Sequence, residues 1–233
     1  MSGAISALII RLVQPLTVPE YDRQRLTEFP ETPHSCLTPF STESERIQTS
    51  PNMSQTIYDI PVNSIDGAAL TLEQFKGKVL LIVNVASKCG LTPQYEALEK
   101  LYEDKRAEGL EVLGFPANNF KGQEPGTDAE IAEFCSSTYD VKFPMFSKIS
   151  VVGADQHPLY RTLTVTQPDT TGDGPFRERL KGYGIEPNLA PDVLWNFEKF
   201  VIGRDGRVVD RFSPDVTADD PRLLAAIQIA LSN

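Results

Sequence analysis

The feature that most constrains the fold of this chain is a buried strand, a helix and a second buried strand in succession. Residues 79–86 are almost all apolar and rich in valine, as in a central strand that is covered on both faces. A helical pattern follows over 93–108 and ends at Gly109, and residues 110–115 then predict another strand. Two strands joined by a helix run parallel in one sheet, because the crossover needs about a dozen residues or more. The segment therefore predicts an α/β fold.

The flanking pattern completes one domain. The other expected elements are a strand over 57–62, a short helix with a capping box of Thr71 and Gln74, a helix capped by Thr127 and Glu130, antiparallel strands over 197–202 and 207–212, and a closing helix over 221–231. A βαβ half followed by a ββα half is the thioredoxin-like plan, an α/β fold with a mixed central sheet flanked by helices. Residues 166–192, rich in proline and glycine, predict a long irregular connection.

Residues 1–52 differ from the rest of the chain. They are rich in proline, serine and threonine and show no sustained periodicity, so we expect a disordered tail. An apolar run near the start is interrupted by Arg11 and lacks the basic flank and cleavage site of a signal peptide. Met53 directly precedes the first predicted strand, so residues 1–52 are alternatively a mis-called N-terminal leader. In either case the folded domain is expected over 53–233.

Composition excludes several classes of protein. A net charge of −10 argues against nucleic acid or an anionic membrane surface as a partner. No apolar run approaches the roughly 18 residues that a membrane span needs. The three cysteines, Cys36, Cys89 and Cys135, are too few for a disulfide scaffold and lack the spacing of metal ligands. We therefore expect catalytic thiols in a reducing compartment, the cytoplasm, and no metal.

Cys89 is the candidate nucleophile. It lies between the end of the predicted strand and the helix that starts after Pro93, where backbone N–H groups and the helix dipole favour an anion. The thiolate is the reactive form of cysteine. A lone cysteine is often buried and inert, but the polar flanks Lys88 and Gly90 favour reactivity here. Attack on a peroxide also needs hydrogen-bond donors, which the loop over 115–126 and the segment 195–200 could supply.

Five separated motifs resemble the signature blocks of the glutathione peroxidase family, in the family's order. They are residues 84–90, 113–126, 143–146, 157–160 and 195–200. The resemblance covers residues 55–231 and is greatest to the short, cysteine-containing bacterial branch. It implies a thiol-dependent peroxidase that reduces hydrogen peroxide and organic hydroperoxides, needs no cofactor and is recycled by thioredoxin or glutathione.

The resemblance also implies a catalytic tetrad. Cys89 matches the peroxidatic residue, and Gln123, Trp195 and Asn196 match the side chains that donate hydrogen bonds to its sulfur. Amide and indole N–H groups suit this role because they are donors that do not titrate. Taken singly, Gln123 and Asn196 are also explained by loop capping, and Trp195 by a half-buried anchor.

Cys135 matches the resolving cysteine of many non-selenium members. The resemblance then implies a Cys89–Cys135 disulfide that thioredoxin, rather than glutathione, reduces. Because a disulfide needs Cα atoms within about 7 Å, we expect the helix over 128–137 to be marginal and mobile. Alternatively, Cys135 is an inert core residue. A further cysteine found in many relatives is replaced by Ala117, and Cys36 lies outside the resemblance and receives no role.

Other readings of the same thiol remain. A dithiol reductase would need a second cysteine where this chain has Thr92, and a peroxiredoxin would need threonine in place of Ala86. A non-enzymatic peroxide sensor would use Cys89 in the same first step, and a binding module would not need it. No arginine cluster suggests a dedicated glutathione pocket, so Lys88 is the nearest expected cation. The subunit-interface insertion of tetrameric members is not evident, so we expect a monomer.

Overall fold

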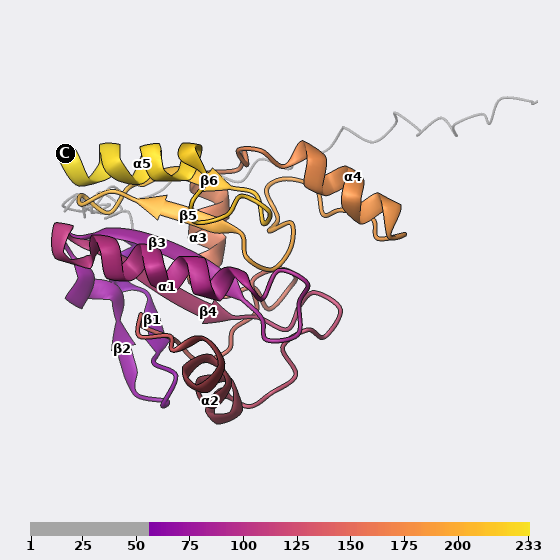
Figure 1. The fold of residues 1–233 in the computed structure, drawn as a ribbon, viewed down its shortest axis with the longest axis horizontal. Coiled ribbons are helices and arrows are strands. Elements are labelled where there is room, and N and C mark those ends of the chain that lie inside the picture. The colour runs from indigo at the N-terminus through magenta and orange to yellow at the C-terminus, as the bar shows by residue number, and fades with distance from the viewer. Residues whose placement is uncertain (1–55) are drawn as a thin grey trace, which may run out of the picture. The chain divides into compact units, whose positions relative to one another are not determined.

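Four strands form the central sheet, in the order β4-β3-β5-β6 (Figure 1). The structure is a computed structural model that describes residues 56–233, so the predictions for residues 1–52 lie outside the described residues. The strands are β3 (Val79–Val85), β4 (Leu110–Pro116), β5 (Lys199–Ile202) and β6 (Val208–Phe212). Strand β3 pairs in parallel with β4 and antiparallel with β5, and β5 pairs antiparallel with β6. The sheet is therefore mixed, as the sequence predicts.

The register of the two parallel strands positions the loops that follow them. All seven residues of β3 and of β4 are buried, which explains their unbroken apolar pattern. Val79 pairs with Leu110 at one end and Val85 with Pro116 at the other. Because the strands are parallel and in step, the segment after β3 and the segment after β4 leave the sheet at the same edge.

The described residues form five α-helices. They are α1 (Gln94–Lys105), α2 (Asp128–Tyr139), α3 (Pro158–Thr166), α4 (Gly174–Gly182) and α5 (Pro221–Ser232). Figure 1 shows α1 and α5 on the near face of the sheet and α3 on the far face. The aromatic ring of Tyr160, in α3, packs on the rings of Phe115 of β4 and Phe200 of β5, at centroid distances of 6.2 and 6.1 Å. The thioredoxin-like architecture is therefore built on both faces of one sheet.

Two helix ends follow the local sequence signals. A single 3₁₀ turn, η3 (Arg106–Glu108), extends α1, and Gly109 ends it in the left-handed conformation at φ 104°. Thr127 caps α2 and forms both halves of a capping box with Glu130, as predicted. Both signals lie within a few residues of the helix end, so they determine where the helix starts or ends independently of the tertiary structure.

The N-terminal part of the described chain differs from the prediction. The expected strand over 57–62 is a 3₁₀ turn, η1 (Ile57–Asp59), followed by the short strand β1 (Pro61–Asn63). A capping box between Thr56 and Asp59 favours the helical turn, which overrides the apolar pattern of a strand. Strand β1 forms an antiparallel hairpin with β2 (Ala69–Thr71), across a turn in which the N–H of Gly67 donates to the Ser64 carbonyl at 2.8 Å.

The short helix after β2 is the 3₁₀ element η2 (Leu72–Phe75). Thr71 caps it, but its hydroxyl accepts from the N–H of Glu73 at 3.5 Å. The prediction of a capping box between Thr71 and Gln74 is therefore wrong. A 3₁₀ turn is tighter than the α-helix in which such a box forms, so the hydroxyl meets the N–H of Glu73 instead.

The predicted irregular connection over 166–192 contains helix α4. Phe176 and Leu180 lie one helical turn apart and are both buried, so the helix has an apolar face. Proline in its first turn is compatible with a helix start. The prediction of an irregular connection over the whole of 166–192 is therefore wrong. The spacing of Phe176 and Leu180 indicates a helix, but the prolines and glycines around them obscured this signal. No helix in residues 56–233 has the length and apolar character required to cross a membrane.

Candidate active site

Cys89 lies in the turn between β3 and α1, where only 8% of its surface is exposed. The Thr92 hydroxyl shapes this turn: it accepts from the N–H of Cys89 at 3.0 Å and donates to the Ala86 carbonyl at 2.8 Å. The N–H of Leu91 donates to the Cys89 sulfur at 3.4 Å. The turn itself therefore supplies one of the donors that the sequence analysis expected for a reactive sulfur.

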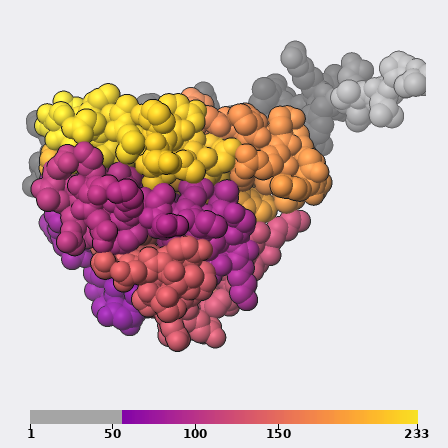
Figure 2. Space-filling view, in the orientation of Figure 1, coloured from indigo at the N-terminus to yellow at the C-terminus, as the bar shows by residue number. Residues whose placement is uncertain are grey.

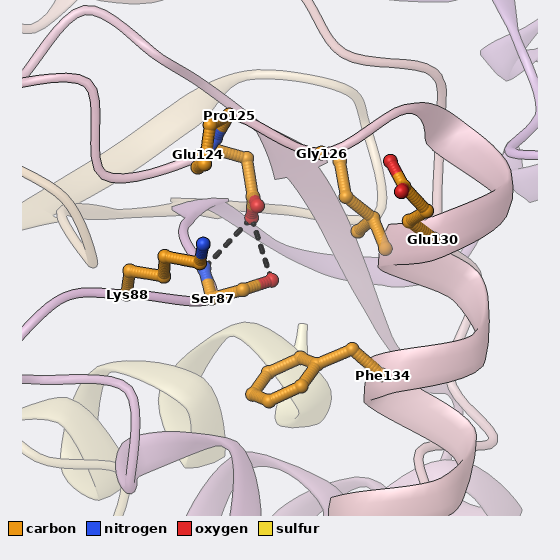
Figure 3. A pocket seen from close by; sticks show the side chains of 8 residues that line it. Ser87, Lys88, Glu124, Pro125, Gly126, Glu130 and Phe134 are labelled. Carbon is orange, nitrogen blue, oxygen red and sulfur yellow. Dashed lines mark hydrogen bonds between the residues drawn. The ribbon is translucent and has the colours of Figure 1, made fainter.

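The loop after β4 is joined to this turn. The N–H of Lys88 donates to the Gln123 carbonyl at 3.0 Å. The carboxylate of Glu124 accepts from Ser87 twice, from its N–H at 2.8 Å and from its hydroxyl at 3.1 Å (Figure 3). Burial raises the pKa of Glu124, although the hydrogen bonds from Ser87 oppose that shift. These contacts hold Gln123 beside the cysteine turn.

Asn84 of β3 holds residues 195–198, which form the third segment of the site and are called the Trp195 segment below. The sequence predicted no role for Asn84. Its amide donates to the Trp195 carbonyl at 3.0 Å, and its side-chain oxygen accepts from the N–H of Glu198 at 3.1 Å. Between these two contacts, Phe197 takes a positive φ of 68°. A buried polar residue inside a central strand was the signal that could have identified Asn84, because such a group needs partners.

The structure brings the four tetrad residues together. Cys89, Gln123 and Trp195 line one cavity of about 250 Å³. The fully buried Asn196 donates from its amide to the Gln123 side-chain oxygen at 2.9 Å. Since this oxygen accepts from Asn196, the NH₂ group of Gln123 remains a donor on its other side. In the part of the chain that the structure describes, the sulfur accepts from Leu91 and not from these three side chains.

Cys135 does not share this cavity. It lies in α2, is 2% exposed, and is a free thiol like Cys89. Burial raises its pKa to about 11, with the buried Tyr95 beside it. A second cavity, of about 440 Å³, lies between the Ser87 segment and α2, with Phe134 on its helical side (Figure 3). The structure therefore places the two thiols on different elements, in their reduced state.

Helix α4 and the residues that follow it form one wall of the Cys89 cavity, which the sequence analysis missed. The lining side chains from this segment are Phe176, Arg179, Leu180, Tyr183 and Ile185. Arg179 is the cation that lines this cavity, whereas Lys88, which the sequence predicts to be the nearest cation to Cys89, lines the other one. Among residues 56–233, no cluster of three or more histidine, cysteine or acidic side chains could hold a metal ion.

A mixed sheet with a cysteine at the turn from its central strand into a helix is typical of thiol oxidoreductases of thioredoxin-like fold. Gln123, Trp195 and Asn196, which lie together at this site, narrow the choice among thiol oxidoreductases further. The chain belongs to the glutathione peroxidase family, whose model, described as "Glutathione peroxidase", matches residues 57–164. It is a peroxidase of this family, an oxidoreductase that acts on peroxides.

Relatives and solved structures agree with this assignment. The thioredoxin/glutathione peroxidase BtuE of Escherichia coli is 50% identical over 182 residues, which cover 77% of this chain and 100% of that protein. The crystal structure of T. cruzi GPX1 is 33% identical, with a TM-score of 0.56 over 77% of this chain and 98% of that one. A thioredoxin-family thiol:disulfide interchange protein from Chlorobium tepidum, 13% identical, has a TM-score of 0.50 over 76% and 98% of the two chains. This last similarity concerns the fold alone.

Proposed function

We propose that this protein reduces hydrogen peroxide and organic hydroperoxides through a cycle of two cysteines, Cys89 and Cys135. The observation that carries the proposal is the shared cavity of Cys89, Gln123 and Trp195. A nucleophile there shares the cavity with side chains that carry neutral N–H donors, and the Leu91 N–H already contacts its sulfur. We assign the activity to residues 53–233, and we expect a cytoplasmic monomer.

The first step follows from this arrangement. The Cys89 thiolate attacks the terminal oxygen of a hydroperoxide, a sulfur–oxygen bond forms and the oxygen–oxygen bond breaks. Sulfur is oxidised to sulfenic acid, and the departing oxygen takes a proton and leaves as water or an alcohol. The indole N–H of Trp195 and the amide of Gln123 would stabilise the negative charge that develops on the oxygens. Asn196 would act by orienting the Gln123 amide, with which it shares a hydrogen bond.

The second step requires α2 to open. Cys135 would attack the sulfenic acid, form the Cys89–Cys135 disulfide and release water. Its thiol is buried and its pKa raised to about 11, so it must leave its packed site before it can ionise near neutral pH. The end of α2 is suited to opening, because Ser136, Ser137 and Thr138 are exposed and are poor helix formers.

Thioredoxin is the proposed reductant, with glutathione as the alternative. A disulfide between two protein cysteines is reduced by exchange with a dithiol, which leaves both cysteines as thiols. The Escherichia coli relative carries both reductants in its name, so the name leaves the choice open. The Cys89 cavity has one arginine, Arg179, rather than a cluster, which favours thioredoxin.

One experiment separates these possibilities. Reduced protein is treated with one equivalent of hydrogen peroxide, and the cysteines are mapped by non-reducing mass spectrometry. The proposal predicts a Cys89–Cys135 linkage, followed by steady turnover with thioredoxin, thioredoxin reductase and NADPH. Sulfenic or sulfinic Cys89 with unmodified Cys135 would move the reductant to glutathione. Oxidation without turnover by either reductant would favour a peroxide sensor, and an unreacted Cys89 thiol would refute the peroxidase cycle.

A further inference from the structure

The α4 segment makes the Cys89 cavity larger and less polar than hydrogen peroxide requires. Two oxygen atoms need roughly the space of two water molecules, about 60 Å³, whereas the cavity measures about 250 Å³. Phe176, Leu180 and Ile185 from the α4 segment contribute apolar side chains to its lining. Phe176 and Leu180 are almost fully buried, so this wall is anchored in the fold.

The cavity is open at its outer rim. Tyr183, which lines it, is 73% exposed. Figures 1 and 2 show α4, in orange, at the surface beyond the end of the sheet and of α5. A ligand can therefore reach Cys89 past α4, with one end at the sulfur and the other directed toward solvent.

The charge of the wall restricts what this ligand can be. Arg179 is the cation that lines the cavity, and Asp215 already pairs with it at 3.3 Å. The guanidinium also lies over the Phe176 ring, at 5.5 Å from its centroid. Because Asp215 offsets the arginine's charge, the wall does not select for an anion. Glutathione, with two carboxylates and an ammonium group, is poorly matched to it.

We propose that the α4 wall, Phe176, Leu180, Tyr183 and Ile185, is a binding subsite for the uncharged apolar group of an organic hydroperoxide. This inference rests on the peroxidase function proposed above. The wall selects organic hydroperoxides over hydrogen peroxide by holding the organic group while the terminal oxygen meets the sulfur. The attack of the Cys89 thiolate is the one described above: the sulfur–oxygen bond forms, the oxygen–oxygen bond breaks, and the organic group leaves as an alcohol after taking a proton.

The test measures the oxidation step alone. Trp195 is the single tryptophan of the chain and lines the cavity, so its fluorescence can follow oxidation of Cys89 in a stopped-flow instrument. Reduced protein is mixed with cumene hydroperoxide or with hydrogen peroxide, with no reductant present. The variants are Leu180→Ala, which keeps a good helix former in α4, and Tyr183→Ser, which changes an exposed side chain and should fold normally.

We expect Leu180→Ala to lower the second-order rate constant for cumene hydroperoxide about tenfold, and Tyr183→Ser about threefold, since small changes in an apolar pocket are worth roughly tenfold or more. The rate constant for hydrogen peroxide should change less than about twofold. The matched control is Leu189→Ser, on the same segment and 79% exposed but outside the cavity lining, which should change neither rate.

Three outcomes would overturn the inference. Equal losses with both peroxides in both variants would show that α4 supports the site without selecting the substrate. Unchanged selectivity in Tyr183→Ser and Leu180→Ala would show that the wall does not touch the organic group. Normal oxidation of both variants by both peroxides, with slower turnover in a separate assay that contains thioredoxin or glutathione, would assign the wall to the reductant instead. Failure of wild-type protein to react with either peroxide would refute the proposed function itself, which is a separate result.

Discussion

Arg211 joins the sheet to both ends of the segment that carries α4, and its removal should be costly. The side chain is 1% exposed and forms an ion pair with the fully buried Glu198. Its guanidinium also donates, at 2.9–3.1 Å, to the carbonyls of Gln167, Pro168, Pro191 and Asp192. The residues before and after α4 are therefore fastened to one strand, β6, by one side chain.

The variant Arg211→Met should lower the free energy of unfolding by at least about 4 kcal/mol. Breaking a buried ion pair on one side costs about 3–5 kcal/mol, because the remaining charge stays buried without its partner. Four carbonyls also lose a donor, and each buried unpaired group costs roughly a further 1 kcal/mol where water cannot replace the donor. Total stabilities of domains are about 5–15 kcal/mol, so this loss would be a large share.

Urea denaturation followed by Trp195 fluorescence and far-UV circular dichroism would measure the effect. Trp195 is well placed, because the N–H of the preceding residue, Leu194, donates to Glu198 at 2.6 Å. The double variant Arg211→Met/Glu198→Gln removes the orphaned charge and should recover about 2 kcal/mol. Arg211→Lys keeps a cation without the guanidinium fork and should fall between wild type and Arg211→Met. A loss below about 1 kcal/mol in Arg211→Met, or no recovery in the double variant, would refute this reasoning.

Three further perturbations test other parts of the structure. Burial lowers the pKa of Lys199 to about 7, so between that pH and about 10.4 the unfolded chain binds more protons than the folded one. Stability should rise with pH across this window by up to about 1.4 kcal/mol per unit in wild type, and Lys199→Met should lack that slope in denaturation curves. Asn84→Leu removes both side-chain hydrogen bonds of Asn84 with the Trp195 segment and should destabilise by about 2 kcal/mol while slowing Cys89 oxidation; an unchanged oxidation rate would separate Asn84 from catalysis. Thr127→Ala deletes the α2 cap, at a cost of about 1 kcal/mol, and should speed disulfide formation about fivefold if helix opening limits it, measured by quenched-flow trapping.

Local signals in the sequence were enough to predict much of the fold. The apolar runs of β3 and β4 and the glycine after α1 act over a few residues, and the structure confirms each of them. The same holds for the capping box of Thr127 and Glu130. Where two local signals compete, prediction was less secure: the cap at Thr56 turned the start of an expected strand into a 3₁₀ turn.

The sequence by itself also determined the family and the identity of the candidate site residues, because Cys89, Gln123 and Trp195 lie in motifs that can be recognised without coordinates. Only the tertiary structure decided what surrounds them. Asn84 reaches the Trp195 segment across 111 positions of sequence, and the α4 wall meets Cys89 across a similar span. Such contacts depend on how the sheet, its loops and helix α4 pack together. No local periodicity encodes that packing, so the cavity's apolar wall and the paired Arg179 emerged only from the folded chain.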